Sequence, residues 1–331
     1  MWWRRAGRRA PAAGAEAVID DLVERARAGD PRAVARLITL VESGDPALPE
    51  IAAALGSDSV KAVVIGITGS PGVGKSTTTN ELVRAFRKRG RRVGVLAVDP
   101  SSPFTGGAIL GDRVRMQDHA IDPGVYIRSM SSRGHLGGLA AATPAAVRVL
   151  AGAGCEVVLV ETVGVGQAEV EIASLADTTV VLLAPGMGDA IQAVKAGILE
   201  IADIFVVNKA DRDGADNTYR DIQGMIALGG SERSPGEWRP KVLKAVAVRN
   251  EGIDEVVEAL EEHRLWLERT GELTKRRRHR AAAEIEALAL GQLRAKFAEL
   301  PGEGLAELAA EVAEGRLDPY AASTRLLDGI S

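Results

Sequence analysis

The stretch GITGSPGVGKSTTTNELV, which runs from Gly66 to Val83, decides the fold of this chain. It follows an apolar run at residues 62–65, which is typical of a buried strand, and it leads into a polar segment that predicts a helix. Between the two, residues 69–76 match the pattern G-x-x-x-x-G-K-[ST] at every position. Because this pattern stands between a strand and a helix, it predicts a loop that holds the phosphates of a nucleoside triphosphate.

The residues of this loop have separate tasks. The glycines permit a positive φ and a close approach to oxygen, so that backbone N–H groups and the helix N-terminus converge on the β-phosphate. Lys75 is expected to reach the β- and γ-phosphate oxygens, and the Ser76 hydroxyl to bind Mg²⁺. Partition-type ATPases carry a second lysine at the position of Ser70, which argues against that class. The predicted nucleotide-binding residues here are Gly69, Ser70, Pro71, Gly72, Val73, Gly74, Lys75, Ser76 and Thr77.

Short apolar runs alternate with helical patterns along the central part of the chain. Their hydrophobicity is continuous rather than alternating, which is typical of parallel strands that are buried on both faces. The sequence therefore predicts an α/β fold, a P-loop NTPase with a mostly parallel sheet flanked by helices. The runs are AVVIGIT (62–68), RVGVLAVD (92–99), GVYIRSM (124–130), CEVVLVE (155–161), DTTVVLLAP (177–185), DIFVVNK (203–209) and KVLKAVAV (241–248).

The base is predicted by Asn208-Lys209-Ala210-Asp211, an N-K-x-D element that follows one of these runs. The Asp211 carboxylate can accept hydrogen bonds from guanine N1–H and from the exocyclic amine of guanine. Adenine would leave the carboxylate without these donors, so a site of this kind rejects it. Asn208 is expected to brace the loop and the Lys209 stem to cover the ring. The nucleotide is therefore predicted to be GTP or GDP.

A second base-side loop is expected after the last strand, at Val246, Ala247 and Val248. A backbone N–H of this loop could reach guanine O6. GTPases often have Ser-Ala at the first two positions, and Val246 departs from that pattern, although donation from the backbone needs no serine.

Two apolar runs end in an acid, at Asp99 and at Glu161. The carboxyl ends of the strands in an open α/β sheet face the ligand, so these two carboxylates and Ser76 are the expected Mg²⁺ ligands. Glu161 also begins Glu161-Thr162-Val163-Gly164, a D-x-x-G element with Glu in place of Asp. The N–H of Gly164 can then meet the γ-phosphate and act as a switch.

Hydrolysis is expected to be slow in the isolated chain. Ras-type GTPases place a water-positioning Gln directly after the D-x-x-G glycine, whereas this chain has Val165 there and Gln167 further on. A partner protein would then raise the rate. The candidates for charge stabilisation in cis are Arg113, Arg115 and Arg133.

Composition limits the possible partners and cellular location of the chain. The net charge of −4 provides no basic field for nucleic acid. The single cysteine, Cys155, excludes an internal disulfide framework and a four-cysteine zinc site, and it fits a reducing compartment. No apolar run approaches the roughly 18 residues of a membrane span. The chain is therefore expected to be cytoplasmic, without a nucleic acid or membrane partner.

Three regions are predicted. Residues 1–60 contain a basic tail and a helical extension, residues 61–267 the GTPase domain, and residues 268–331 a helical arm. The arm begins with a run of basic residues, which is unusual for a buried helix. Its apolar positions need a partner surface, so the arm is predicted to mediate homodimerisation. These positions are Ile285, Leu288, Leu293 and Phe297.

Several loops exceed what a minimal GTPase requires, and together they closely resemble the MeaB/ArgK family, the GTPases associated with methylmalonyl-CoA mutase. The resemblance runs from about residue 15 to the end of the chain and is densest between residues 61 and 211. The loops are DPSSPFTGGAILGDRVRM (99–116), SMSSRGHLGGLA (129–140), VETVGVGQAEVEI (160–172) and PGMGDAIQAVKAGILEIADIFVVNKAD (185–211).

This resemblance implies a cytosolic homodimer that binds an adenosylcobalamin-dependent mutase. It implies that the chain gates cofactor delivery from the adenosyltransferase and protects the mutase from inactivation. It also implies that phosphate and Mg²⁺ chemistry lies at Lys75, Ser76, Asp99, Asp112 and Glu161.

Residues 186–195 resemble an additional switch of the family, which relays the nucleotide state to the mutase. Asp189 and Lys195, together with Gln167 outside this segment, are expected to carry the switch and relay. Relatives often have an acid after the aspartate of this segment, whereas this chain has Ala190, which puts the internal salt links of the segment in doubt.

Two alternatives stay open. A nickel metallochaperone GTPase would carry a Cys/His metal site, but this chain has one Cys and 4 His without ligand spacing. A transport-linked kinase or ATPase for lysine, arginine and ornithine would need ATP, and the N-K-x-D element argues against it. Phosphotransfer from ATP to a protein would favour the kinase.

Overall fold

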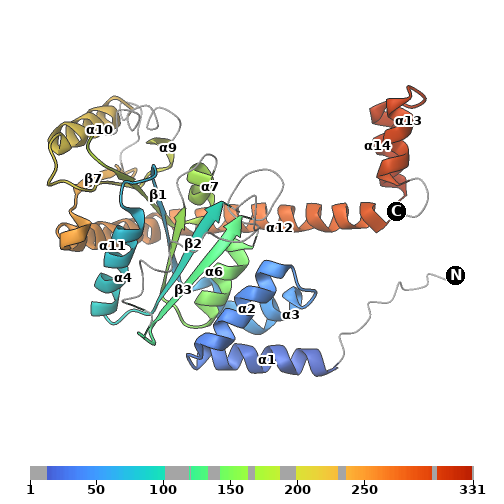
Figure 1. Ribbon diagram of the computed structural model, residues 1–331, viewed down its shortest axis with the longest axis horizontal. Coiled ribbons are helices and arrows are strands. Elements are labelled where there is room, and N and C mark those ends of the chain that lie inside the picture. The colour runs from blue at the N-terminus through green and yellow to red at the C-terminus, as the bar shows by residue number, and fades with distance from the viewer. Residues whose placement is uncertain are drawn as a thin grey trace. The chain divides into compact units, whose positions relative to one another are not determined.

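The computed structural model describes residues 13–100, 119, 121–132, 142–162, 168–186, 199–229, 236–299 and 304–329. The chain divides into two compact units, with the boundary between Leu273 and Thr274. The first unit is built around a sheet with helices on both faces (Figure 1). None of the described helices combines the length and the apolar character that crossing a membrane requires.

The sheet contains seven described strands in the order β3-β2-β4-β1-β5-β6-β7, and each neighbouring pair is parallel. The predicted α/β fold is confirmed, and each predicted apolar run contains one strand. Such runs suit strands that are covered on both sides. The strands are β1 (Val63–Thr68), β2 (Val93–Pro100), β3 (Val125–Ser132), β4 (Val157–Thr162), β5 (Thr178–Leu183), β6 (Ile204–Val207) and β7 (Lys241–Lys244).

The last strand occupies only the first half of its apolar run, and the loop predicted at residues 246–248 follows it. β7 ends at Lys244, whereas the run continues to Val248. The Val246 N–H donates instead to the backbone oxygen of Glu251 at 2.9 Å, and a 3₁₀ turn, η4 (Ala247–Arg249), follows. The apolar residues after Lys244 therefore form a turn at the carboxyl edge of the sheet.

Helices cover the two faces of the sheet in separate groups. α4 and α11 pack on one face, where Ile65 and Leu159 share a core with Leu260. α6 and α7 pack on the opposite face, and α10 covers the end of that face over β6 and β7. The bounds are α4 (Lys75–Lys88), α6 (Thr143–Gly152), α7 (Ala168–Leu175), α9 (Leu199–Ile201), α10 (Ala215–Gly229) and α11 (Ile253–Thr270).

The helices that precede the sheet share its core. Leu37 and Leu55 are buried in one cluster with Val64 and Leu150. A Cβ on Gly152 would lie 2.5 Å from a methyl carbon of Leu55, so this glycine permits the close approach of two helices. These elements therefore belong to the first compact unit. They are α1 (Ala13–Arg27), α2 (Pro31–Ser43), α3 (Leu48–Leu55) and η1 (Gly56–Val60).

A buried histidine joins α11 to the sheet. His263 Nδ1 lies 2.8 Å from the Thr178 hydroxyl, and Nε2 lies 3.3 Å from a carboxylate oxygen of Asp203. Trp238 and Trp266 pack against the imidazole ring. A buried histidine needs such partners, so these contacts explain His263 as a structural residue of the core.

The second unit is helical. α12 (Glu272–Glu299) begins at the end of the first unit, and α13 (Leu305–Ala313) and α14 (Pro319–Asp328) pack against each other. Leu308 and Ala322 are buried in this unit. Large apolar side chains of α12, among them Ile285 and Leu288, are exposed.

Candidate functional site

The phosphate-binding loop joins β1 to α4, as the sequence predicts, and its glycines adopt left-handed conformations. The φ angles are 137° at Gly69, 81° at Gly72 and 97° at Gly74. A Cβ at Gly69 would lie 2.2 Å from the backbone oxygen of Leu182, and one at Gly74 would lie 2.4 Å from Nδ2 of Asn208. Both the conformation and the close packing therefore require glycine.

The lysine and the serine of the motif occupy the first turn of α4. The Lys75 ammonium donates to the backbone oxygens of Gly69 at 2.7 Å and Ser70 at 3.1 Å, so it lies over the loop. The Ser76 hydroxyl donates to Oε1 of Glu161 at 2.7 Å. Glu161 is only 4% exposed. The chain thus places a buried carboxylate beside the hydroxyl that the motif assigns to magnesium.

The strand order explains how Glu161 reaches Ser76. β4 lies between β1 and β2, and Glu161 is in register with Ile67 on one side and Ala97 on the other. The backbone of Asp99 stands at the end of β2, beyond the register partner of Glu161. Because these strands are parallel, both acids and the phosphate-binding loop lie at the same edge of the sheet.

Several predicted site residues fall outside the described residues. They are Asp112, Gly164, Gln167, Asp189 and Lys195, together with the three candidate arginines Arg113, Arg115 and Arg133.

Asn208 connects three loops at the carboxyl end of β6. Its Nδ2 donates to the backbone oxygen of Val73 at 2.8 Å, and its Oδ1 accepts from the N–H of Ala247 at 3.1 Å. Lys209 has a φ of 57°, and its ammonium donates a hydrogen bond to the backbone oxygen of Gly72 at 2.7 Å. The N-K-x-D element is therefore tied to the phosphate-binding loop and to the turn after β7.

The turn after β7 offers one candidate donor for guanine O6 among its predicted residues. The N–H groups of Val246 and Ala247 already donate to Glu251 and Asn208. Val248 is the remaining residue of the three, and its side chain is exposed. Arg249 follows it and lies 3.9 Å from a carboxylate oxygen of Asp211. No sequence pattern pointed to Arg249, because its orientation depends on the conformation of the turn.

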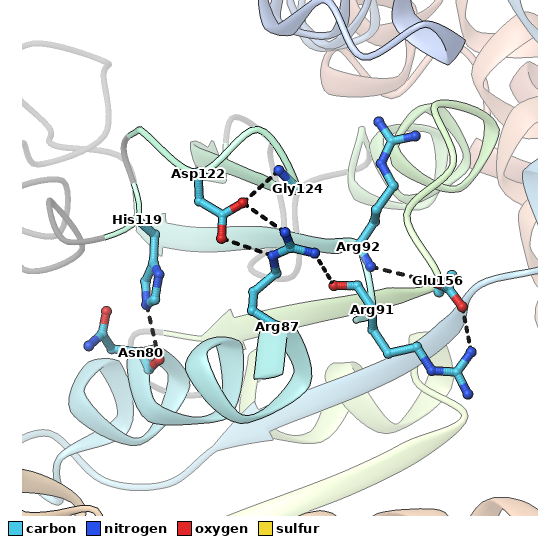
Figure 2. Close-up of polar contacts among 8 residues, drawn as sticks. All are labelled: Asn80, Arg87, Arg91, Arg92, His119, Asp122, Gly124 and Glu156. Carbon is cyan, nitrogen blue, oxygen red and sulfur yellow. Dashed lines mark hydrogen bonds and ion pairs between the residues drawn. The ribbon is translucent and has the colours of Figure 1, made fainter. Parts of the chain in front are cut away.

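A second polar network fixes the far end of α4 (Figure 2). The Arg87 guanidinium donates to both carboxylate oxygens of Asp122, each at 2.9 Å. Asp122 also accepts a hydrogen bond from the Gly124 N–H at 2.8 Å. This arginine holds the pKa of Asp122 below its usual value. His119 Nε2 lies 3.3 Å from the backbone oxygen of Asn80 in the same helix. The chain that leads into β3 is thereby attached along the helix that carries Lys75.

The acids and histidines of the described residues include no group of three or more Asp, Glu, His or Cys side chains that could hold a metal ion. Among the described side chains, Ser76 and Glu161 are the predicted magnesium ligands that the structure brings together, and the side chain of Asp99 lies outside the described residues.

The comparisons with known proteins agree with this architecture. Residues 34–301 match the family model described as Methylmalonyl Co-A mutase-associated GTPase MeaB. A protein of Pyrococcus abyssi (strain GE5 / Orsay), which carries a provisional GTPase name, is 48% identical over 314 residues, covering 95% of this chain and 97% of that protein. A Caenorhabditis elegans protein named Methylmalonic aciduria type A homolog, mitochondrial, is 33% identical, covering 93% of this chain and 82% of that protein.

A solved structure supports the same fold. The crystal structure of an LAO/AO transport system kinase superimposes with a TM-score of 0.67 at 28% sequence identity, and the match covers 95% of this chain and 98% of that chain. The similarity therefore includes the helices that flank the nucleotide-binding core.

Proposed function

We propose that this chain, which belongs to the MeaB family of methylmalonyl-CoA mutase-associated GTPases, uses GTP hydrolysis to gate adenosylcobalamin delivery to a cobalamin-dependent acyl-CoA mutase and to protect that mutase. GTPase activity follows from membership of the family. The mutase as partner, the gating of cofactor delivery and the roles of individual residues are our proposals.

The extent of the family match carries this proposal. A match limited to the nucleotide-binding core would indicate a GTPase and nothing about its client. Here the match begins at residue 34, inside α2, and ends at residue 301, beyond α12. It therefore includes helices that the GTP site does not need, and such helices are available to bind a partner.

The phosphate side of the site fits GTP and Mg²⁺. Lys75 would bind the β- and γ-phosphate oxygens, and the amides of residues 69–77 would surround the β-phosphate. Ser76 and Glu161 present two oxygen ligands 2.7 Å apart, which is the ligand chemistry that Mg²⁺ prefers. When bound, this ion would neutralise charge on the phosphates. Asp99, Asp112 and Gly164 are proposed to complete this side of the site.

The base side fits guanine. Asp211 would accept from both guanine donors, and the aliphatic stem of Lys209 would cover the ring on its way to Gly72. Asn208 would keep the two base-side loops at a constant distance from the phosphate-binding loop. These contacts make the base site rigid before the nucleotide binds, which lowers the entropic cost of binding.

The assembly is also proposed. The exposed apolar side chains of α12 suit a homodimer, and the adenosyltransferase is the further partner that cofactor delivery requires. The net charge of −4 does not suit a nucleic acid partner, and a cytoplasmic location suits the single buried cysteine.

The deciding experiment measures the purified full chain together with the methylmalonyl-CoA mutase of its own organism. We expect a complex in size-exclusion chromatography, faster GTP turnover with the mutase than without it, and slower loss of mutase activity during turnover. Lys75→Ala should bind the mutase without protecting it in response to GTP. Absence of a complex with any nucleotide would contradict the proposal.

The same samples test the kinase alternative, which the name of the superimposed crystal structure raises. Transfer of the γ-phosphate of ATP to a protein, with no preference for GTP, would favour it. We expect turnover of GTP and no labelled protein.

A further inference from the structure

Backbone hydrogen bonds and left-handed residues define the conformation of the turn between β7 and α11. Val246 and Glu251 exchange two backbone hydrogen bonds, at 2.9 and 3.3 Å. Asn250 adopts a left-handed conformation with a φ of 56°, and Gly252 follows with a φ of 77°. A Cβ at Gly252 would lie 2.2 Å from the backbone oxygen of Lys244, so this position requires glycine. The turn therefore has one defined conformation.

This turn is attached to the N-K-x-D loop. The Ala247 N–H donates to Oδ1 of Asn208 at 3.1 Å, and the Ala210 N–H donates to the backbone oxygen of Ala245 at 3.0 Å. These two bonds flank the loop that carries Asp211. The backbone of the turn consequently keeps its position relative to the loop that carries Asp211.

Arg249 is the side chain of the turn that faces this carboxylate. Its Nε and Nη2 atoms contact the two carboxylate oxygens of Glu251 at 3.0 and 3.3 Å. Its Nη2 also lies 3.9 Å from Oδ2 of Asp211. Glu251 thus holds the guanidinium in a forked contact, and the guanidinium is shared with Asp211.

The separation of 3.9 Å has a specific consequence. It exceeds hydrogen-bond length, so the cation attracts the carboxylate without taking up its acceptor positions. Both oxygens can still accept from guanine. A serine at position 246 could offer a hydroxyl donor near this loop, but Val246 cannot.

We propose that Arg249 is a positioning residue for guanine recognition, which restrains the Asp211 carboxylate from the turn after β7. This inference rests on the proposed reading of guanine by Asp211. Arg249 restrains the carboxylate before the nucleotide binds. Because GTP and GDP share the guanine base, the restraint raises the affinity for both equally. It does not act on the phosphates, so kcat is unaffected and KM changes.

The contribution of Arg249 to nucleotide affinity is limited by the solvent exposure of the two side chains. The side chains of Arg249 and Asp211 are 51% and 37% exposed, so their attraction is partly screened by water. Removal of Arg249 should raise the Kd for GDP by about two- to fivefold. The effect should shrink at high ionic strength, because exposed charges are screened by salt.

A double-mutant cycle tests this interaction in the full chain. Calorimetry would measure the Kd for GDP of the wild type, Arg249→Ala, Asp211→Asn and the double variant, at about 0.1 M and about 1 M salt. Arg249→Ala should weaken GDP binding in the wild-type background, mostly at low salt. It should have no effect in the Asp211→Asn background, and Arg249→Lys should restore part of the loss.

Arg212→Ala is the matched control. It removes the same charge next to Asp211, but within the described residues Arg212 makes no ion pair with that carboxylate. It should leave the Kd nearly unchanged. Equal thermal stability of all variants would show that none of them misfolds.

The outcomes separate two failures. If Asp211→Asn leaves GDP binding unchanged, the base assignment itself is wrong. If Asp211→Asn weakens binding but Arg249→Ala costs the same in both backgrounds, or costs nothing, Arg249 does not act through Asp211 and this inference is overturned. Tighter GDP binding by Arg249→Ala would show that the arginine competes with guanine, which would also overturn it.

Discussion

The Ser76 hydroxyl donates a hydrogen bond of 2.7 Å to the Glu161 carboxylate, and this bond joins the first turn of the P-loop helix to the end of β4. The two residues belong to different motifs of the sequence. Their contact exists because β4 pairs with β1, so that its last residues lie next to the loop that leaves β1.

This contact predicts the behaviour of Glu161, and the place of Asp99 at the end of β2 predicts the same for that acid. Glu161→Ala or Asp99→Ala should lower GTP hydrolysis by about tenfold or more, because the proposed magnesium ligands act at the γ-phosphate. GDP affinity should fall less, since the loop amides still hold the β-phosphate. Single-turnover hydrolysis and GDP titration would measure the two effects.

Glu156→Ala is the control for this prediction, because Glu156 directly precedes β4 at the opposite end of the strand and pairs with Arg91. It should leave hydrolysis unchanged. Wild-type hydrolysis by both strand-end variants would show that these acids have no role at the metal.

A second prediction concerns the first glycine of the P-loop. Gly69→Ala should abolish nucleotide binding and lower the stability by about 1–3 kcal/mol, because the new Cβ meets the backbone oxygen of Leu182 in a conformation with φ of 137°. Gly224→Ala, in α10, meets nothing within 4 Å and should be neutral or slightly stabilising. Thermal unfolding of the two variants would measure the difference, and equal melting temperatures would refute the steric argument.

The third prediction concerns assembly. Ile285 and Leu288 of α12 are 68% and 56% exposed, and they lie one helical turn apart. Ile285→Glu combined with Leu288→Glu should convert the proposed homodimer into a monomer in light scattering, because charge cannot be buried at an apolar interface. Ala283→Glu adds charge elsewhere around the same helix and should leave the dimer intact. A dimer that survives the double change would place the interface elsewhere.

The fourth prediction concerns pH. Arg87 lowers the pKa of Asp122 in the folded chain below its ordinary value of 3.8. The ion pair therefore contributes stability above that ordinary value and loses it as the pH falls through the lower, folded-state value. The melting temperature of Arg87→Ala should lie below that of the wild type at pH 7, and the gap should shrink as the pH falls below about 4.

Arg89→Ala, which removes an exposed ion pair with Asp254, serves as the comparison for this pH series. Its melting temperature should stay within a degree or two of the wild type, since exposed pairs contribute little. A gap for Arg87→Ala that stays constant down to acidic pH would mean that Asp122 is not the group involved.

The fifth prediction concerns the relay to the mutase. Lys195→Ala should keep the intrinsic GTP turnover and mutase binding but lose the stimulation of turnover by the mutase, because Lys195 and Asp189 are proposed to pair differently in the GTP and GDP states. Turnover would be measured with and without mutase for both proteins. Equal stimulation of the variant and the wild type would rule out the relay.

The sequence by itself determined the fold class and predicted a guanine nucleotide. The P-loop needs residues 69–76 and a strand and helix on either side, and all of these are consecutive in the chain. The strands could be located because each lies in a short apolar run; β1, β4, β5 and β6 are almost entirely buried, whereas the edge strand β7 is only partly buried. The N-K-x-D element is also local, so its chemistry could be read before its position was known.

Only the tertiary structure decided which distant residues meet. Strand order brought Glu161 to Ser76. The bidentate contact of Arg87 with Asp122 joins α4 to the segment before β3, and no sequence motif links these two segments. A loop was predicted at residues 246–248, but only the folded conformation of this turn brings Arg249 to 3.9 Å from the Asp211 carboxylate. Local patterns report the burial and the backbone preferences of a segment. Contacts between segments depend on strand order and loop conformation, which arise when the whole chain packs.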